Sequence, residues 1–178
     1  MNYAKINLFD IANGKGIRVS LFVSGCQFHC PECFNESAQD YNYGKIFTDK
    51  EERIILNRLK DDNFSGLSII GGDPLWQNPD GLHQLQKLCA KVHALNKDVW
   101  IWSGFTWEEI FNNNELDMQN PLLMQLRRAV IVESDVFIDG RFEKDKKDLS
   151  LYWKGSSNQR VIDVKKSLKE REIILYDR

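Results

Sequence analysis

Apolar residues in this chain gather in short runs separated by polar stretches and turn residues. Runs that are rich in β-branched and aromatic residues are typical of buried strands. We therefore predict strands over 17–24, 67–70, 99–102, 129–132, 136–138 and 172–176.

Between these runs, apolar residues recur at the spacing of an amphipathic helix. Helices are predicted over 51–59, 80–95 and 121–126. Thr48 or Asp49 can cap the first of them, and Thr106 with Glu109 forms a capping-box pattern that opens a further short helix. Strands that alternate with helices indicate an α/β fold with a parallel sheet built from βα units.

Charge and hydropathy argue against binding to nucleic acid and against insertion into a membrane. The 178 residues include 24 Lys and Arg against 26 Asp and Glu, so no basic field is present to attract nucleic acid. No stretch approaches the roughly 20 apolar residues of a membrane helix, and the N-terminus lacks a signal-peptide pattern. We expect a cytoplasmic protein with no membrane partner, forming one domain over 1–178 with a C-terminal extension after about 160.

Three of the four cysteines lie in one short loop after the first of these strands. Cys26, Cys30 and Cys33 have a Cys-x3-Cys-x2-Cys spacing, which lets one loop present three thiolates to a compact centre. Thiolates select zinc or iron–sulfur clusters, and cytosolic cysteines favour such sites over disulfides. Because clusters usually take four cysteines, we predict a cluster with one iron open to a small ligand. Cys89, on the apolar face of a predicted helix, is expected to be a buried hydrophobe.

Two other interpretations of the cysteine loop stay open. The three cysteines could form a structural zinc site with His29, although His29 adjoins Cys30 and both side chains would have to bend onto one ion. A non-catalytic electron carrier normally uses four cysteines, which this loop does not supply. His83 and His93 fall in the predicted helix over 80–95 and are expected to have surface roles.

A Gly-Gly-Asp-Pro turn follows the strand predicted over 67–70. Ligands in α/β sheets bind at the carboxyl ends of strands, where glycines let the backbone approach them closely. Gly71, Gly72 and Asp73 would share this rim with the cysteine loop, and carbonyl groups there can accept hydrogen bonds from an ammonium group. Ser103, at the end of the strand over 99–102, is a further candidate at the rim.

Taken in order, these motifs resemble the radical SAM superfamily. Within it, the chain is similar to the activating proteins of anaerobic (class III) ribonucleoside-triphosphate reductases, over residues 1 to about 160. The matching stretches are 13–18, 21–26, 30–35, 71–75, 100–105, 138–142 and 154–159. The last two of these are more specific to the activating proteins than to the superfamily as a whole.

The resemblance implies an incomplete β/α barrel and a defined chemistry. Cys26, Cys30 and Cys33 would ligate a 4Fe–4S cluster whose fourth iron binds S-adenosylmethionine. One electron, from a donor such as a flavodoxin, would cleave this molecule to a deoxyadenosyl radical, which takes a hydrogen atom from a glycine of the reductase. An activase of the formate-lyase type is the alternative enzyme, but such activases tend to carry an aromatic residue at the position of Glu32.

The resemblance also implies cofactor contacts. The residues implied for the amino group of S-adenosylmethionine are Gly71, Gly72 and Asp73. Glu32, Cys33 and Phe34 lie where the family's cysteine loop runs along the adenine, and Phe34 stands where Tyr is common. The stretch 154–159 is expected near the reductase.

Overall fold

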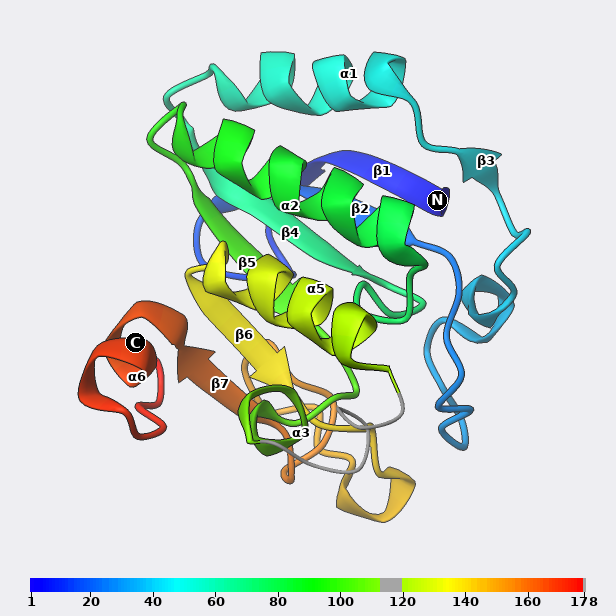
Figure 1. The fold of residues 1–178 in the computed structure, drawn as a ribbon, viewed down its shortest axis with the longest axis vertical. Coiled ribbons are helices and arrows are strands. Elements are labelled where there is room, and N and C mark those ends of the chain that lie inside the picture. The colour runs from blue at the N-terminus through cyan, green and yellow to red at the C-terminus, as the bar shows by residue number, and fades with distance from the viewer. Residues whose placement is uncertain (113–119, 178) are drawn as a thin grey trace.

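The fold is a seven-stranded mixed sheet with helices packed on one side (Figure 1). The computed structural model describes residues 1–112 and 120–177. In these residues the strand order is β3-β1-β2-β4-β5-β6-β7. The strands are β1 (Asn2–Asp10), β2 (Ile17–Val23), β3 (Lys45–Ile46), β4 (Phe64–Gly71), β5 (Asp98–Trp102), β6 (Val136–Asp139) and β7 (Arg160–Asp163).

The centre of the sheet is parallel and its flanks are antiparallel. Strands β2, β4, β5 and β6 pair in parallel, as the alternation of strands and helices predicted. The expectation of a parallel sheet is wrong at the flanks, because β1 and β7 run antiparallel to their neighbours. Neither flanking strand was predicted, since their half-exposed positions give no continuous apolar run.

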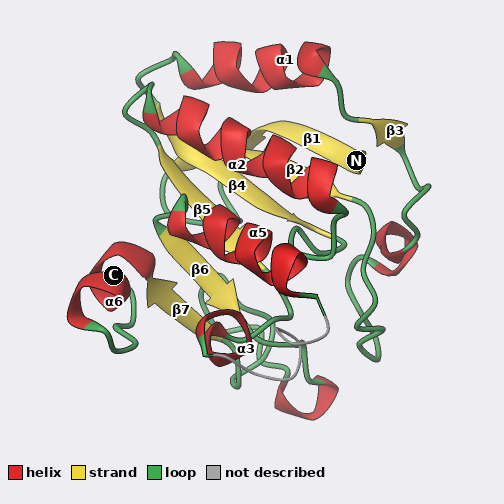
Figure 2. Cartoon of the chain, viewed as in Figure 1, coloured by secondary structure: helices red, strands yellow, loops and turns green. Residues whose placement is uncertain are grey.

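Helices α1, α2 and α5 cover one face of the sheet (Figure 2). Thr48 caps α1 in a capping box with Glu51, and Asn78 caps α2 with Pro79 in its first turn. The helices are α1 (Asp49–Leu59), α2 (Pro79–His93), α3 (Trp107–Phe111), α5 (Pro121–Val132) and α6 (Val164–Glu170), with 3-10 turns η1 (Glu36–Gln39) and η2 (Lys144–Lys146).

Two sequence predictions of strands are wrong. Residues 129–132 continue helix α5, which Asn120 caps, and its buried face runs on through Val130 and Ile131. A run of four apolar residues has no period of its own, so it cannot distinguish a strand from the last turn of a helix. Residues 172–176 form no strand, and Leu175 makes only an isolated bridge with Ile162.

The two faces of the central strands differ in chemistry. Leu21, Ile69 and Ile101 are fully buried in the core under the helices. The opposite face carries Trp100 and the fully buried Arg18, which donates to the Ser68 hydroxyl at 2.7 Å. The second face therefore supports buried polar groups and leads, at the carboxyl ends of the strands, to the site described below.

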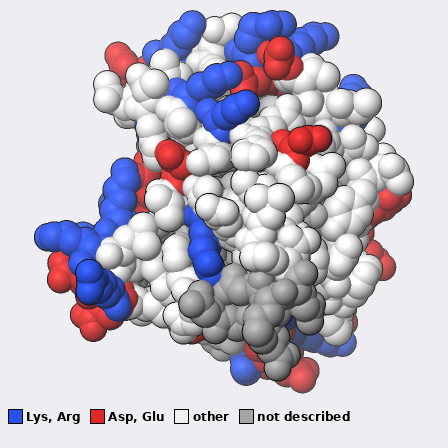
Figure 3. Space-filling view, viewed as in Figure 1, with Lys and Arg blue, Asp and Glu red and all other residues white. Residues whose placement is uncertain are grey.

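The surface seen from the helical side carries mixed charge. Basic and acidic side chains lie near one another on this face, and no field of one sign covers it (Figure 3). None of the helices described in the structure is both long and apolar enough to cross a membrane.

Candidate functional site

Segments that follow the four parallel strands meet around one cavity of about 490 Å³. Because parallel strands end at the same edge of a sheet, residues far apart in the sequence come together there. The cavity is lined from β2 by the three loop cysteines, from β4 by the glycine turn, from β5 by Ser103 and Gly104, and from β6 by Gly140 and Phe142. The sequence-predicted residues that line it are Cys26, Cys30, Cys33, Phe34, Gly71, Gly72, Asp73 and Ser103.

The base of the cysteine loop is fixed by backbone hydrogen bonds. The Gly25 N–H donates to the Ala38 carbonyl at 2.7 Å, and the Cys26 N–H donates to the Gln39 carbonyl at 3.0 Å. His29 and Glu32 adopt left-handed backbone conformations, with φ of 49° and 55°, and these turn the chain between the cysteines. The loop therefore brings three half-buried thiols to the wall of one cavity.

The thiols are held in a poorly solvated setting. Burial raises the pKa of the Cys26 thiol to about 12, and the nearby Asp73 carboxylate adds to the rise. Burial also raises the pKa of Cys30. A metal centre bound here must therefore displace thiol protons as it binds.

Cys89 is separate from this site. It lies on α2 within the hydrophobic core and is fully buried, which confirms its prediction as a small buried hydrophobe. Burial also raises the pKa of its thiol. The cavity consequently offers three thiols from one loop, a donor set that fits three irons of a 4Fe–4S cluster and leaves the fourth for a small ligand.

His29 has a protein partner of its own. Its Nδ1 lies 2.8 Å from Oε1 of Gln39, and the contact is exposed. Among the residues that the structure describes, no three His, Cys, Asp or Glu side chains converge closely enough to hold a single metal ion. His83 is exposed, as expected, whereas His93 is half-buried and its Nε2 lies 2.8 Å from Oδ2 of Asp135.

The two glycines of the turn let β4 end against the cysteine loop. A Cβ on Gly72 would lie 2.5 Å from the Ala38 carbonyl oxygen and 2.7 Å from that of Gly25. A Cβ on Gly71 would lie 2.4 Å from the Val23 carbonyl oxygen, and its φ of +118° also favours glycine. The close approach that requires these glycines is thus between two segments of the protein itself.

The Asp73 side chain organises the end of β5. Its carboxylate accepts from the Ser103 hydroxyl at 2.9 Å, from the Gly104 N–H at 2.8 Å and from the Leu75 N–H at 2.8 Å. Burial raises the pKa of Asp73 to about 6, although these donors and the charge of Arg127 oppose the rise. Asp73 therefore joins the turn after β4 to the turn after β5 at the cavity wall.

Glu32 and Phe34 are placed differently from one another. Glu32 is exposed and pairs with Lys144 at 2.5 Å, and it does not line the cavity formed by the described residues. Phe34 lines the cavity while 67% exposed, and its ring packs edge-on against Phe142, 5.7 Å between centroids. The structure thus places the Phe34 ring, and not the Glu32 carboxylate, at the wall of the cavity.

Known proteins are similar to this chain over most of its length. A family model described as a 4Fe-4S single cluster domain matches residues 12–162. The chain is 40% identical over 165 residues to the anaerobic ribonucleoside-triphosphate reductase-activating protein of Escherichia coli K12, covering 90% of this chain and 97% of that protein. The protein of the same name from Pasteurella multocida is 39% identical over 163 residues, with 89% and 95% covered. That of Enterobacteria phage T4 is 35% identical over 163 residues, with 90% and 93% covered.

The chain belongs to this family of reductase-activating proteins. The residues matched by the cluster-domain model include the cysteine loop and all the residues that line the cavity, from Ala12 to Gln159. The 4Fe–4S cluster is therefore the centre that this member of the reductase-activating family is built to hold.

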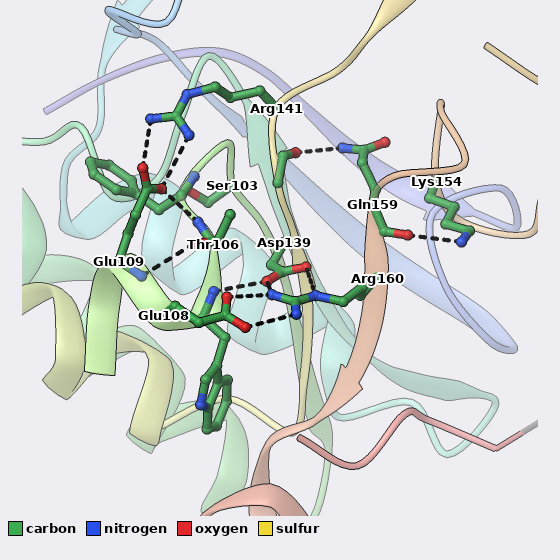
Figure 4. A network of polar contacts seen from close by, with 12 residues as sticks. Ser103, Thr106, Glu108, Glu109, Asp139, Arg141, Lys154, Gln159 and Arg160 are labelled. Carbon is green, nitrogen blue, oxygen red and sulfur yellow. Dashed lines mark hydrogen bonds and ion pairs between the residues drawn. The ribbon is translucent and has the colours of Figure 1, made fainter. Parts of the chain in front are cut away.

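One wall of the cavity was not predicted from the sequence. The segment 140–159, between β6 and β7, supplies Trp153, Lys154, Gly155 and Gln159. Gln159 holds this segment in place. Its side-chain amide donates to the Gly140 carbonyl at 2.8 Å (Figure 4). Its amide oxygen accepts from the Gly155 N–H, also at 2.8 Å. The resemblance had marked residues 138–142 and 154–159 but implied no cavity role for either.

Proposed function

We propose that this protein activates an anaerobic ribonucleoside-triphosphate reductase by reductive cleavage of S-adenosylmethionine, which leaves a glycyl radical on the reductase. The observation that carries the proposal is the set of three thiols that one loop brings to the wall of a cavity. The relatives of the chain are named anaerobic ribonucleoside-triphosphate reductase-activating proteins. The missing fourth thiolate favours a catalytic centre over an electron carrier.

The chain's own residues bind and shield the reacting groups. When bound, the reduced 4Fe–4S cluster supplies the electron that cleaves S-adenosylmethionine, and this sets off hydrogen-atom removal from the reductase glycine. Cys26, Cys30 and Cys33 are the proposed ligands of three irons. The Phe34 ring lines the cavity and packs on Phe142, and there it would limit the access of water to the bound centre.

The turn after β4 is the proposed binding place for the amino group of S-adenosylmethionine. Gly71, Gly72 and Asp73 line the cavity together. An ammonium group beside the buried Asp73 carboxylate would compensate the charge that burial disfavours. Ser103 acts with Asp73, because its hydroxyl donates to both carboxylate oxygens at 2.9 Å and so fixes their direction.

The open architecture of the sheet suits a protein substrate. We propose that the sheet forms an incomplete β/α barrel, whose open side admits a loop of the reductase. The proposed electron donor is a small reductant such as a flavodoxin, and the proposed location is the cytoplasm, where thiols stay reduced.

The test is activation of the reductase under anaerobic conditions. The protein is reconstituted with iron and sulfide, reduced, and mixed with S-adenosylmethionine and the reductase. Electron paramagnetic resonance should then show a glycyl-radical doublet on the reductase, with one deoxyadenosine released per cleavage event. An intact cluster that gives neither product would exclude this function.

Two variants assign the ligands in the same experiment. Cys30→Ala should lose both the cluster and the radical signal, because only two thiolates remain in the loop. Cys89→Ala should keep its iron and its activity, and should lose about 1 kcal/mol of stability through the small cavity left in the core. Full activity in Cys30→Ala, or loss of iron in Cys89→Ala, would contradict the ligand assignment.

A further inference from the structure

Arg141 links the segment 140–159, which forms one wall of the cavity, to helix α3. It follows β6 directly after Gly140, and its guanidinium makes a two-point ion pair with Glu109 (Figure 4). Nη2 lies 2.9 Å from Oε1, and Nη1 lies 3.2 Å from Oε2. Two parallel hydrogen bonds fix the plane of the guanidinium as well as its position.

Glu109 is itself held by the start of α3. Its carboxylate accepts from the Thr106 N–H at 2.9 Å, while its own N–H donates to the Thr106 hydroxyl at 3.2 Å, which completes a capping box. The cap orients the carboxylate toward Arg141. The guanidinium is therefore anchored to a helix terminus and not to a mobile surface side chain.

Arg141 also covers the cysteine loop. Its guanidinium carbon lies 4.4 Å from the centroid of the Phe28 ring, within cation–π distance. Phe28 stands between Cys26 and Cys30 in the loop, and its N–H donates to the Cys26 sulfur at 3.5 Å. The inner side of the same ring packs against Phe105 and Trp76, with centroids 4.9 and 5.4 Å away. Phe28 is thus clamped between the core and Arg141.

The charge of Arg141 lies beside the cysteine loop, because its guanidinium stacks on the ring of Phe28, which stands between Cys26 and Cys30. A positive charge beside the sulfur ligands stabilises the more negative, reduced form of an iron–sulfur cluster. Arg141 is 43% exposed, so its influence should weaken as salt is added.

We propose that Arg141 is a positioning residue for the iron–sulfur centre, which clamps the cysteine loop through Phe28 and raises the reduction potential of the cluster with its charge. This inference rests on the proposed function only in placing a cluster on the three loop cysteines. It does not depend on which protein receives the radical.

The experiment compares three variants of the full chain in the absence of S-adenosylmethionine and reductase. Arg141→Gln removes the charge and the clamp, and Arg141→Lys keeps the charge without the planar two-point contact. Arg58→Gln is the matched control, because Arg58 is 39% exposed, pairs with Asp61 at 3.4 Å and lies 4.2 Å from the Phe64 ring, away from the cavity. The midpoint potential at low ionic strength and the rate of iron release to a chelator are measured for each.

Arg141→Gln should have a more negative midpoint potential than the unmodified protein, and roughly 10-fold faster iron release. Arg141→Lys should recover most of the potential while still releasing iron faster. Arg58→Gln should match the unmodified protein in both. If Arg141→Gln loses its cluster on purification, the rates of iron release from Arg141→Lys and Arg58→Gln are compared. Faster release from Arg141→Lys supports the clamp, and equal release contradicts it.

Equal potentials and equal release rates in Arg141→Gln and Arg58→Gln would overturn the proposal. A decrease in midpoint potential that is as large in Arg141→Lys as in Arg141→Gln would also overturn it, because the charge would then have no effect. The glycyl-radical assay is run in parallel on the unmodified protein. Absence of the radical together with the expected shift in potential would reject the proposed function and leave the role of Arg141 standing.

Discussion

At the scale of single residues, the approach of two backbones sets the shape of the cavity floor. Asp73 donates its N–H to the Gly25 carbonyl at 2.8 Å, and Gly72 donates to the Val23 carbonyl at the same distance. These bonds place the turn after β4 directly against the base of the cysteine loop. The glycine pair was expected for the sake of a ligand, and its first role is to join these two segments.

A methyl group at Gly72 should therefore disturb the cysteine loop. Its carbon would meet backbone oxygens at 2.5 and 2.7 Å, which cannot move as a side chain can. We expect Gly72→Ala to lose about 1–3 kcal/mol of unfolding free energy and to bind less iron after reconstitution. Urea denaturation and iron analysis measure these effects.

Gly155→Ala is the control for this change. Gly155 also lines the cavity, but the nearest atoms to its Cβ belong to the Phe142 and Phe34 rings, at 3.2 to 3.6 Å. Side-chain rings can shift by a few tenths of an ångström, so a much smaller loss is expected. Similar losses in both variants would mean that the contact with the loop base is unimportant.

The sequence placed the cysteines and the glycine turn at one rim of the sheet, because each motif directly follows a predicted strand, and both line the cavity. It did not predict Phe28 or Arg141, since a single aromatic or basic residue has no local pattern that reports a contact 113 positions away along the chain. It did not distinguish Glu32 from Phe34 either, because the direction of a side chain in a loop depends on positive φ angles that the sequence does not reveal.

At the scale of elements, α3, β6 and β7 are tied together by Arg160. Its guanidinium pairs with both Glu108 oxygens, at 2.9 and 2.7 Å, and with the buried Asp139, which also accepts from the Trp107 N–H at 2.8 Å (Figure 4). Hydrogen bonding to Arg160 lowers the pKa of Glu108 to about 2. This network holds the short helix over the end of the sheet.

Removing the Glu108 charge should have an effect that depends on pH. Because the folded-state pKa is lower than the unfolded value, the stabilisation is complete above about pH 4.5 and is lost as the pH falls toward 2. We expect Glu108→Gln to cost no more than about 1 kcal/mol at pH 7, since the pair is partly exposed, and less at pH 3. Urea unfolding at pH 7, 5 and 3 checks this.

The exposed Glu172 provides the comparison. Glu172→Gln should change the unfolding free energy little at any of the three pH values. A loss in Glu108→Gln that stays constant from pH 7 to pH 3 would show that the carboxylate charge does not cause it.

Elements with a cap or a continuous apolar run were predicted well, including the short strands β5 and β6 and the short helix α3, whereas β1, β3 and β7 were missed. Helices α1 and α2 each have a cap and an apolar stripe, so both features indicate the same boundaries. Helix α5 was split into a helix and a strand because its last turn is entirely apolar. Its helical state is set by packing against α2 and α3, which lies beyond any local window of sequence.

At the scale of the whole molecule, the C-terminal residues cover the face of the sheet opposite the helices. The Tyr176 ring packs edge-on against Trp100, 5.1 Å between centroids, and 6.1 Å from Trp153. Its N–H donates to the Val161 carbonyl at 2.8 Å. The residues after about 160 thus support Trp100 and Trp153, the second of which lines the cavity.

Loss of this ring should loosen the covered face. We expect Tyr176→Ala to lose about 1–2 kcal/mol of stability and to shift tryptophan emission to longer wavelength, because Trp100 is only 1% exposed in the intact protein. Tyr176→Phe keeps the ring and should change neither quantity. An unshifted emission spectrum in Tyr176→Ala would show that the ring does not shield Trp100.

The pairing of β6 with β7 determines how easily the segment between them can be replaced by that of another family member. Asp139 and Arg160 face each other across the sheet, so the 20 residues between them begin and end at neighbouring points. A loop with adjacent ends can change in length at little entropic cost. Chimeras that take this segment from another family member should therefore fold, and they would exchange one wall of the cavity while keeping the three loop cysteines.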